Sequence, residues 1–342
     1  MDSKQDNSFL AEENQPLVSD QSSRTFALDV KEGLLADKKF LPSKYIYDQY
    51  GDRIFQQIME MPEYYLTGAE YNIFNEQKAN ILAALKEGVE SFDLVEFGAG
   101  DGYKTKVLLQ YFVDQQTQFK YVPNDISPNI VDYLENDLEE SIPALHVEGV
   151  RGDFFEVFHR IENSTVHVRK AILFLGANIG NFSRKESVDF LRRIASFMDP
   201  DDRFMIGFDL KKNPATILNA YNDAAGITAS FSKNLLKRIN RELGGEFKEN
   251  TFEFYPVYNP QDGNVKSYLI SKEEQDVYIA SLDQTFHFNA WEAMFMERSK
   301  KYSLADINAL AEASGFEVVH NFIDANNLFS DSLWKLRQEK PD

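Results

Sequence analysis

The chain has 342 residues and carries 36 Lys and Arg against 55 Asp and Glu, a formal net charge of −19 at pH 7. Its length predicts two domains, or one domain with a large insertion. Its acidity argues against nucleic acid or an anionic membrane surface as a partner. Cysteine is absent and only five histidines are present, which excludes disulfides, thiolate ligands and a cysteine nucleophile, and we predict no metal site.

The first 22 residues are polar and acidic, and their composition predicts a disordered tail. They lack the apolar run of a signal peptide, and no part of the chain approaches about 18 consecutive apolar residues. We therefore expect a cytoplasmic protein without a transmembrane helix.

Strand-like and helix-like segments alternate through the middle of the chain. We predict strands at 92–97, 119–125, 171–176 and 203–210, and helices at 104–113, 129–141 and 184–198. The segment 171–176 is almost wholly apolar, as is typical of a strand covered on both faces. This alternation predicts a parallel, doubly wound α/β sheet.

The pattern changes after Leu210. A helix-like stretch at 216–243 is followed by β-like segments rich in aromatic residues and Thr, with a turn at 259–264. Ser303 then caps a predicted helix that ends near Gly315, and strands are predicted at 316–322 and 332–336. We predict one domain over 70–210 and 302–342, and a second, discontinuous domain over 23–69 and 211–301.

A glycine motif provides the clearest chemical signal. Gly98, Gly100 and Gly102 follow a predicted strand and open a predicted helix, a context in which the backbone can approach a ligand closely. The spacing is GxGxG rather than the GxGxxG of dinucleotide enzymes. Glu96, just before the motif, suits the ammonium or ribose of S-adenosylmethionine better than a pyrophosphate. A tight turn without a ligand is the alternative.

Acidic residues follow the next two strands. Asp125 ends the second predicted strand, where a carboxylate can accept hydrogen bonds from both ribose hydroxyls. Asp153 and Phe154 follow a further strand that we expect just before Gly152, and they can contact the adenine amino group and ring. A turn or capping role for Asp125, and a core position for Phe154, are the alternatives.

Residues 44–74 contain six of the 16 tyrosines of the chain, and aromatic rings with hydroxyl tips suit an ammonium or an aromatic substrate. Asn178 and Asn181 follow the predicted strand at 171–176, at the edge of the sheet where substrates bind in such folds. An Asn amide can serve both ends of an amino acid. Packing for each Tyr, and a turn for each Asn, are the alternatives.

Glu297 and Ser299 are two positions apart, so in a strand they share one face. A carboxylate beside a hydroxyl can hold a two-nitrogen ring such as imidazole. The alternative is a solvated Glu297 paired with Arg298 or Lys300.

Together these segments resemble the histidine-specific, S-adenosylmethionine-dependent Nα-methyltransferases of ergothioneine biosynthesis, from about Leu41 to the C-terminus. The motifs that carry the resemblance are PSKYIYDQYGDRIF, MPEYYLTGAE, LVEFGAGDGYKT, LGANIGNF, AYNDAAGITASF and MERSKKYS. The resemblance implies a Rossmann-like class I methyltransferase domain with a discontinuous α+β substrate-binding domain. It also implies an enzyme that uses S-adenosyl-L-methionine to methylate L-histidine up to Nα,Nα,Nα-trimethylhistidine (hercynine). We expect this enzyme to be a monomer.

The resemblance also implies roles for particular residues. The cofactor contacts that it implies are Gly98, Lys104, Asp125, Asp153 and Phe154, to which the glycine motif itself adds Gly100 and Glu96. The amino acid pocket that it implies comprises Tyr47, Phe55, Tyr64, Asn181, Tyr221, Glu297 and Ser299, to which we add Gly176 and Asn178 from the loop after the strand 171–176. Asn181 and Tyr221 would hold the amino and carboxylate groups, Glu297 and Ser299 the imidazole, and Asn178 stands where the family has Thr.

For the mechanism, we predict that Tyr47 accepts the proton of the amine, directly or through water, that Asn181 orients the nitrogen lone pair, and that Gly176 leaves room for the added methyl groups.

Three other functions compete with this interpretation. They are an Nα-methyltransferase for another amino acid such as tryptophan, a non-catalytic cofactor-binding protein, and a nicotinamide oxidoreductase, which the GxGxG spacing disfavours.

Overall fold

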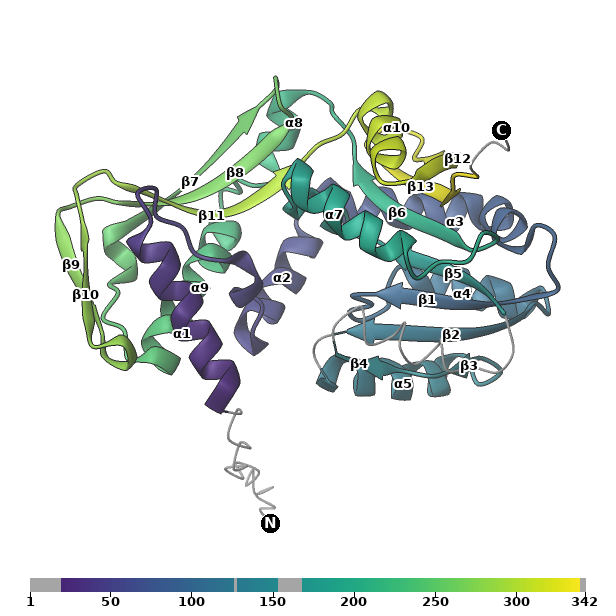
Figure 1. Ribbon diagram of the computed structural model, residues 1–342, viewed down its shortest axis with the longest axis horizontal. Coiled ribbons are helices and arrows are strands. Elements are labelled where there is room, and N and C mark those ends of the chain that lie inside the picture. Colours follow the sequence, from purple (N-terminus) through teal and green to yellow (C-terminus); the bar gives the residue numbers. More distant parts are fainter. Residues whose placement is uncertain (1–19, 126–127, 153–167, 339–342) are drawn as a thin grey trace, which may run out of the picture.

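The apolar segments of the middle of the chain form one sheet in the computed structural model, which describes residues 20–125, 128–152 and 168–338 (Figure 1). Its strands are β1 (Ser91–Phe97), β2 (Gln118–Asp125), β3 (His146–Val147), β4 (Val150–Arg151), β5 (Arg169–Phe174), β6 (Arg203–Asp209), β12 (Phe316–Ile323) and β13 (Phe329–Leu336). Their spatial order is β12-β13-β6-β5-β1-β2-β3, with β4 also paired to β2. The pairs formed among β1 to β6 are parallel, whereas β13 runs antiparallel to β6 and β12 antiparallel to β13.

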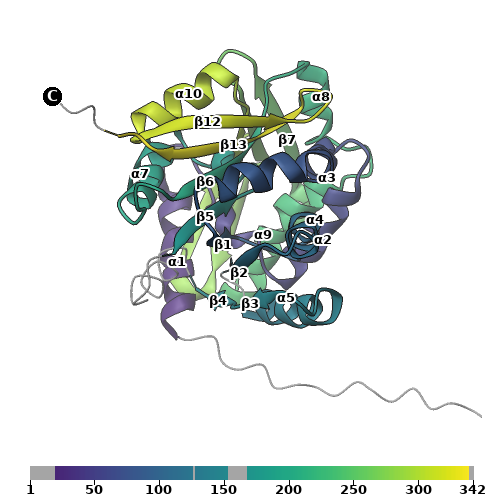
Figure 2. The same ribbon diagram turned by 90° about the vertical axis from the view of Figure 1, so that its right-hand side faces the viewer.

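Helices cover both faces of this sheet. They are α3 (Tyr65–Lys86), α4 (Thr105–Asp114), α5 (Pro128–Ser141), α7 (Arg184–Ala195) and α10 (Leu304–Ala313). In Figure 2, α7 and α10 lie on one side of the strands, and α3 and α4 lie on the other. Strand β5 shows the cause: Ala171 and Leu173 pack in the core under α3 and α4, while Ile172 and Phe174 pack in the core under α7 and α10. The predicted doubly wound, Rossmann-like fold is confirmed.

A second core unites the N-terminal segment with residues after β6. The elements of this part of the chain are α1 (Asp20–Leu35), η1 (Ser43–Tyr45), α2 (Gln49–Glu60), α8 (Pro214–Asn219), α9 (Ile227–Leu243), η3 (Glu249–Thr251), β7 (Phe252–Asn259), β8 (Asn264–Ser271), β9 (Gln275–Ile279), η4 (Ala280–Leu282), β10 (Gln284–Phe288) and β11 (Ala293–Lys300). Val30 of α1, Ile58 of α2 and Leu235 of α9 share one apolar cluster with Leu269 of β8. Strands β7, β8 and β11 form one antiparallel sheet, and β9 and β10 form a hairpin.

Three predictions need correction. Helix α1 begins at Asp20, so residues 20–22 are not part of the predicted tail, and residues 1–19 lie outside the described part. The predicted helix 216–243 is interrupted between α8 and α9, where Gly226 has the left-handed φ of 74°. The Asp223 carboxylate accepts hydrogen bonds from the first amides of α9 at 2.7 and 2.9 Å, which starts a new helix there.

The proposed domain boundary between residues 69 and 70 also falls inside a helix. Leu66 and Ala69 of α3 pack in the same cluster as Phe92 of β1. We therefore propose to move the boundary to the start of α3, at Tyr65. Within the described residues, no helix is long and apolar enough to cross a membrane.

Candidate active site

The glycine motif forms an open cradle between β1 and α4. Gly98 and Gly100 have left-handed φ values of 66° and 57°, and a Cβ atom at either position would have no other atom within 4 Å. Amides of the loop hold it against β2: Gly98 N donates to Asn124 O at 2.8 Å, and Gly100 N donates to Asp125 Oδ2 at 3.3 Å. Glycines with free space beside them fit a ligand that approaches the backbone closely.

Glu96 lies behind this cradle rather than in it. Its carboxylate accepts hydrogen bonds from Thr105 Oγ1 at 2.8 Å and from Tyr121 OH at 2.6 Å, and the residue is buried. Burial raises the pKa of Glu96 to about 7, although both hydrogen bonds oppose this shift. The carboxylate thus anchors the start of α4 to the sheet, and its contact with a cofactor stays a prediction.

Lys104 is tied to the substrate side of the site through a residue that the sequence interpretation missed. Its ammonium forms an ion pair with the buried Glu70 of α3, and Gly176 N donates to the other oxygen of the same carboxylate at 2.8 Å. Burial lowers the pKa of Lys104, but the interactions of Lys104 with Glu70 raise it. The net shift of the Lys104 pKa is upward. Glu70 closes the MPEYYLTGAE motif, but a motif cannot show that its partners are 34 and 106 residues away. Asp153 and Phe154 lie outside the described residues.

A second set of predicted residues lines one cavity between the two cores. All nine residues predicted for the amino acid pocket are among its walls: Tyr47, Phe55, Tyr64, Gly176, Asn178, Asn181, Tyr221, Glu297 and Ser299. The walls that the sequence interpretation missed are Ile58, Leu66, Ala177, Ala220, Thr228, Phe231, Ser232 and Ser267. These are small or apolar residues that carry no chemical signal of their own.

Aromatic rings form one wall of this cavity. Tyr47 contacts the rings of Phe55 and Phe231 edge-on, with centroids 5.8 and 5.3 Å apart, and Tyr64 contacts Tyr221 at 6.3 Å. Tyr47 remains 39% exposed. Desolvation, and then the nearby Glu297, raise the pKa of its hydroxyl above the ordinary 10, so Tyr47 is a neutral phenol near neutral pH.

The loop after β5 forms the wall nearest to the glycine cradle. Asn178 and Asn181 lie in the turn η2 (Asn178–Asn181), and Ala177 before it has the left-handed φ of 59°. The Asn178 side chain donates to Leu175 O at 2.9 Å, so part of its amide is used within the loop. A Cβ on Gly176 would lie 3.7 Å from Lys104 Nζ, which places this loop beside the predicted cofactor contacts.

Glu297 and Ser299 supply the polar wall, from β11. The strand has an irregular register between Phe295 and Glu297, after which Glu297 pairs with Ser267 of β8. Lys300 donates instead to Asp262 O at 2.7 Å, and within the described residues no cation lies within 4 Å of the Glu297 carboxylate. The alternative of a surface ion pair with Arg298 or Lys300 is therefore wrong. Burial raises the pKa of Glu297 to about 7, and Lys301 opposes this.

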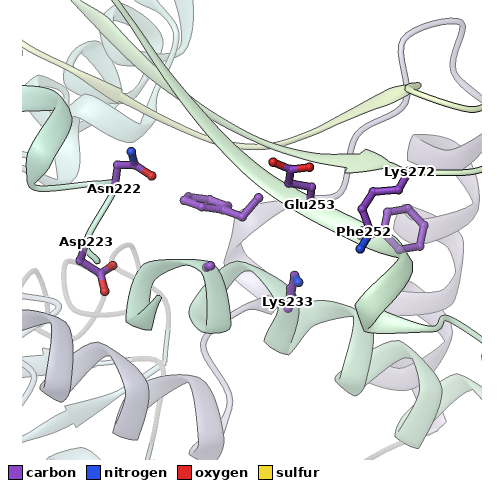
Figure 3. Close-up of a pocket in the computed structure, with 8 residues that line it drawn as sticks. Asn222, Asp223, Lys233, Phe252, Glu253 and Lys272 are labelled. Carbon is purple, nitrogen blue, oxygen red and sulfur yellow. The ribbon is translucent and has the colours of Figure 1, made fainter. Parts of the chain in front are cut away.

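This cavity has a volume of about 60 Å³ and is partly open to solvent. A larger hollow of about 280 Å³ lies between α9 and β7, and its labelled walls include Asn222, Lys233, Glu253 and Lys272 (Figure 3). We place the active site in the smaller cavity because it combines a carboxylate, two amides and aromatic rings beside the glycine cradle.

Comparison with known proteins gives a consistent result. The family described as histidine-specific methyltransferase, SAM-dependent, matches residues 26–336. Histidine N-alpha-methyltransferases of Mycolicibacterium smegmatis and Mycobacterium tuberculosis are 33% and 32% identical, over 93% and 89% of this chain and 97% and 93% of theirs. An L-tryptophan methyltransferase of Psilocybe serbica is 27% identical over 84% of this chain and 86% of its own. The chain belongs to the histidine-specific, S-adenosylmethionine-dependent methyltransferases.

Proposed function

We propose that the enzyme transfers methyl groups to the α-amino nitrogen of L-histidine, up to Nα,Nα,Nα-trimethylhistidine. The observation that carries this proposal is the Glu297 carboxylate, which lines the cavity without a cation within 4 Å in the described part of the chain. A desolvated carboxylate needs a hydrogen-bond donor, and the ring N–H of histidine supplies one. The indole N–H of tryptophan also supplies a donor, but it offers Ser299 no acceptor.

The cofactor, S-adenosyl-L-methionine, supplies an electrophilic methyl group when bound. The open space beside Gly98 and Gly100 fits a group held against the backbone. Asp125 lies beside Gly100, and Lys104 follows in the same loop, with its ammonium near Gly176. We propose that these four residues hold it, together with Asp153 and Phe154. Glu96 would act on it indirectly, through Thr105 at the first turn of α4.

The chain's own residues would orient the amine. We propose that Asn181 and Tyr221 hold the amino and carboxylate groups, while Phe55 and Tyr64 pack against the substrate. The amine of an amino acid is mostly protonated at neutral pH, since its reference pKa is about 8. As a neutral phenol, Tyr47 can accept that proton only by passing its own to water, and its 39% exposure allows this relay. Gly176 and the aromatic walls would accommodate the growing ammonium.

We propose that the enzyme acts as a monomer in the cytoplasm. Sedimentation analysis of the purified protein, and fractionation of its host cells, test these two points separately. The products test the reaction itself. Purified enzyme with histidine and excess cofactor should give masses of mono-, di- and trimethylated histidine, with fragment ions that place each methyl group on the α-nitrogen. Methylation of a ring nitrogen would contradict the proposal.

The cradle predicts a specific defect in Gly98→Ala. Alanine in this left-handed conformation costs about 1–2 kcal/mol, and its methyl group would also occupy the space beside the loop. We expect the calorimetric Kd for S-adenosylmethionine to rise at least about tenfold. Gly88→Ala is the matched control, because Gly88 has a φ of 76° and no atom within 4 Å of its Cβ position, but lies in the turn between α3 and β1. Equal losses in both variants would refute the role of the cradle.

The pKa of Glu297 predicts a pH dependence. The ionised carboxylate accepts a stronger, charge-assisted hydrogen bond from a ring N–H than the protonated acid does, and this group ionises near its raised pKa of about 7. KM for histidine should therefore fall as the pH rises from about 6 to about 8. With the Glu297→Gln variant, the substrate titrates as it does with the wild-type enzyme, but residue 297 no longer titrates. The ratio of the two KM values should change over this pH range, and a constant ratio would contradict the assignment.

A further inference from the structure

A lysine with a fully buried side chain lies directly behind the polar wall of the active site. Lys301 follows β11 and has no exposed side-chain surface. Its ammonium lies 2.7 Å from each of three oxygens: Asp209 Oδ2, Tyr221 OH and Ser299 Oγ. Two of these three partners line the cavity. The lysine is not explained by the reaction, and it was not singled out in the sequence.

The chain path makes this position rigid. Lys301 N donates to Gly263 O at 2.7 Å, and Tyr302 N donates to Asp209 O at 2.9 Å. The chain thus leaves the antiparallel sheet of β7, β8 and β11 and pairs at once with the carboxyl end of β6, as the ribbon shows between β11 and α10 (Figure 1). Lys301 is held where the two cores meet.

The three contacts use all the protons of the ammonium. A lysine ammonium has three hydrogens and no lone pair, and Asp209, Tyr221 and Ser299 are three acceptors at hydrogen-bond distance. Tyr221 OH and Ser299 Oγ are also 2.9 Å apart, so one hydroxyl donates to the other. The two hydroxyls have two protons in total. One proton is used between them, and one is left to donate into the cavity.

We propose that Lys301 is a positioning residue that orients these hydroxyl protons: Tyr221 OH donates to Ser299 Oγ, and Ser299 donates the remaining proton to the substrate ring beside the acceptor Glu297, which leaves Tyr221 to face the amino group as an acceptor. This inference rests on the proposed function, and it adds the protonation state in which the imidazole ring is bound. A ring between one donor and one acceptor must offer one lone pair and one N–H. Lys301 thus selects the neutral imidazole over the imidazolium, which has no lone pair.

A purely structural role for Lys301 is the competing explanation, and the fold offers a control for it. Asp209 also forms an ion pair with Lys212, whose side chain is 8% exposed. Lys212 Nζ donates to Tyr65 OH at 2.8 Å. Neither Asp209 nor Tyr65 lines the cavity. Lys212→Met therefore removes a buried cation from the same carboxylate without touching either hydroxyl of the substrate wall.

The experiment measures kcat and KM for histidine in the full chain, with saturating cofactor. The variants are Lys301→Met, Lys301→Gln and Lys212→Met, together with Ser299→Ala and the double variant Ser299→Ala, Lys301→Met. Calorimetric binding of S-adenosylmethionine reports whether each variant is folded. Because the contact exists before and during methyl transfer, its loss should appear in KM rather than in kcat.

We expect Lys301→Met to raise KM about tenfold or more, and Lys212→Met to change it less than about twofold. Lys301→Gln should have an intermediate KM, because its amide keeps two protons to donate. The double variant should be no worse than the more impaired single variant. Equal KM values in the Lys301→Met and Lys212→Met variants, effects that multiply in the double variant, or loss of cofactor binding in both Lys301 variants would overturn the proposal. Failure of the proposed function would give a different result, because the wild-type enzyme itself would then leave histidine unmethylated.

Discussion

Glu297→Ala is expected to lower kcat/KM for histidine about 100-fold, because the variant loses a charge-assisted hydrogen bond worth up to about 3 kcal/mol. The carboxylate lines the cavity and has no cation within 4 Å in the described part of the chain, so the substrate ring is its expected partner. Binding of S-adenosylmethionine should be unchanged, since Glu297 lies on β11, whereas the predicted cofactor residues Gly98, Lys104 and Asp125 lie in β2 and in the loop between β1 and α4. Steady-state kinetics and calorimetry check the two expectations.

The control for this variant is Glu253→Ala, which removes an exposed carboxylate from β7, a strand of the same sheet. It should leave kcat/KM for histidine within about twofold of the wild-type value. If Glu297→Ala impaired cofactor binding as strongly as histidine turnover, the carboxylate would serve the fold rather than the substrate. A kcat/KM unchanged in Glu297→Ala would remove the basis for histidine recognition.

Asp209→Ala is expected to cause the largest loss of stability, about 3–5 kcal/mol. Asp209 is fully buried and accepts from Tyr65 OH at 2.9 Å while it pairs with Lys212 and Lys301. Its removal leaves two buried ammonium groups without a carboxylate. Desolvation already lowers the pKa of both lysines, although Asp209 opposes this shift. The midpoint of urea unfolding, at an unchanged denaturant slope, measures the loss.

Asp132→Ala is the comparison, because Asp132 pairs with Arg151 on the surface, where the two side chains are 51% and 48% exposed. A surface ion pair contributes about 1 kcal/mol or less, so this variant should unfold close to the wild-type midpoint. Similar losses in the two variants would show that the cluster around Asp209 is solvated in solution and does not hold the two cores together.

The sheet and much of the site follow from local patterns in the sequence. Apolar runs such as 171–176 predict strands buried on both faces, and the parallel order of those strands brings the glycine motif, Asp125 and Asn181 to one edge. The helices α1 to α3 were not predicted. The interruption before α9 was also missed. It depends on Asp223 as a helix cap, but an aspartate at this position could equally lie on the surface of a continuous helix.

The charged contacts between segments could not be predicted. Asp209 ends an apolar strand, and its contact with Tyr65 spans 144 positions of the chain. Glu70 contacts Lys104 and Gly176, which lie 34 and 106 positions further along the chain. Nothing in the local composition distinguishes such residues from surface charges, since only the folded chain brings their partners together and removes water from them.

The most direct test of the central claim is a competition assay with the wild-type enzyme. Histidine, tryptophan and the other standard amino acids are supplied together with S-adenosylmethionine, and the methylated products are identified by mass. The account predicts Nα-methylated histidine, up to the trimethylated product, as the dominant species. A preference for tryptophan or any other amino acid, with histidine left unmodified, would contradict it.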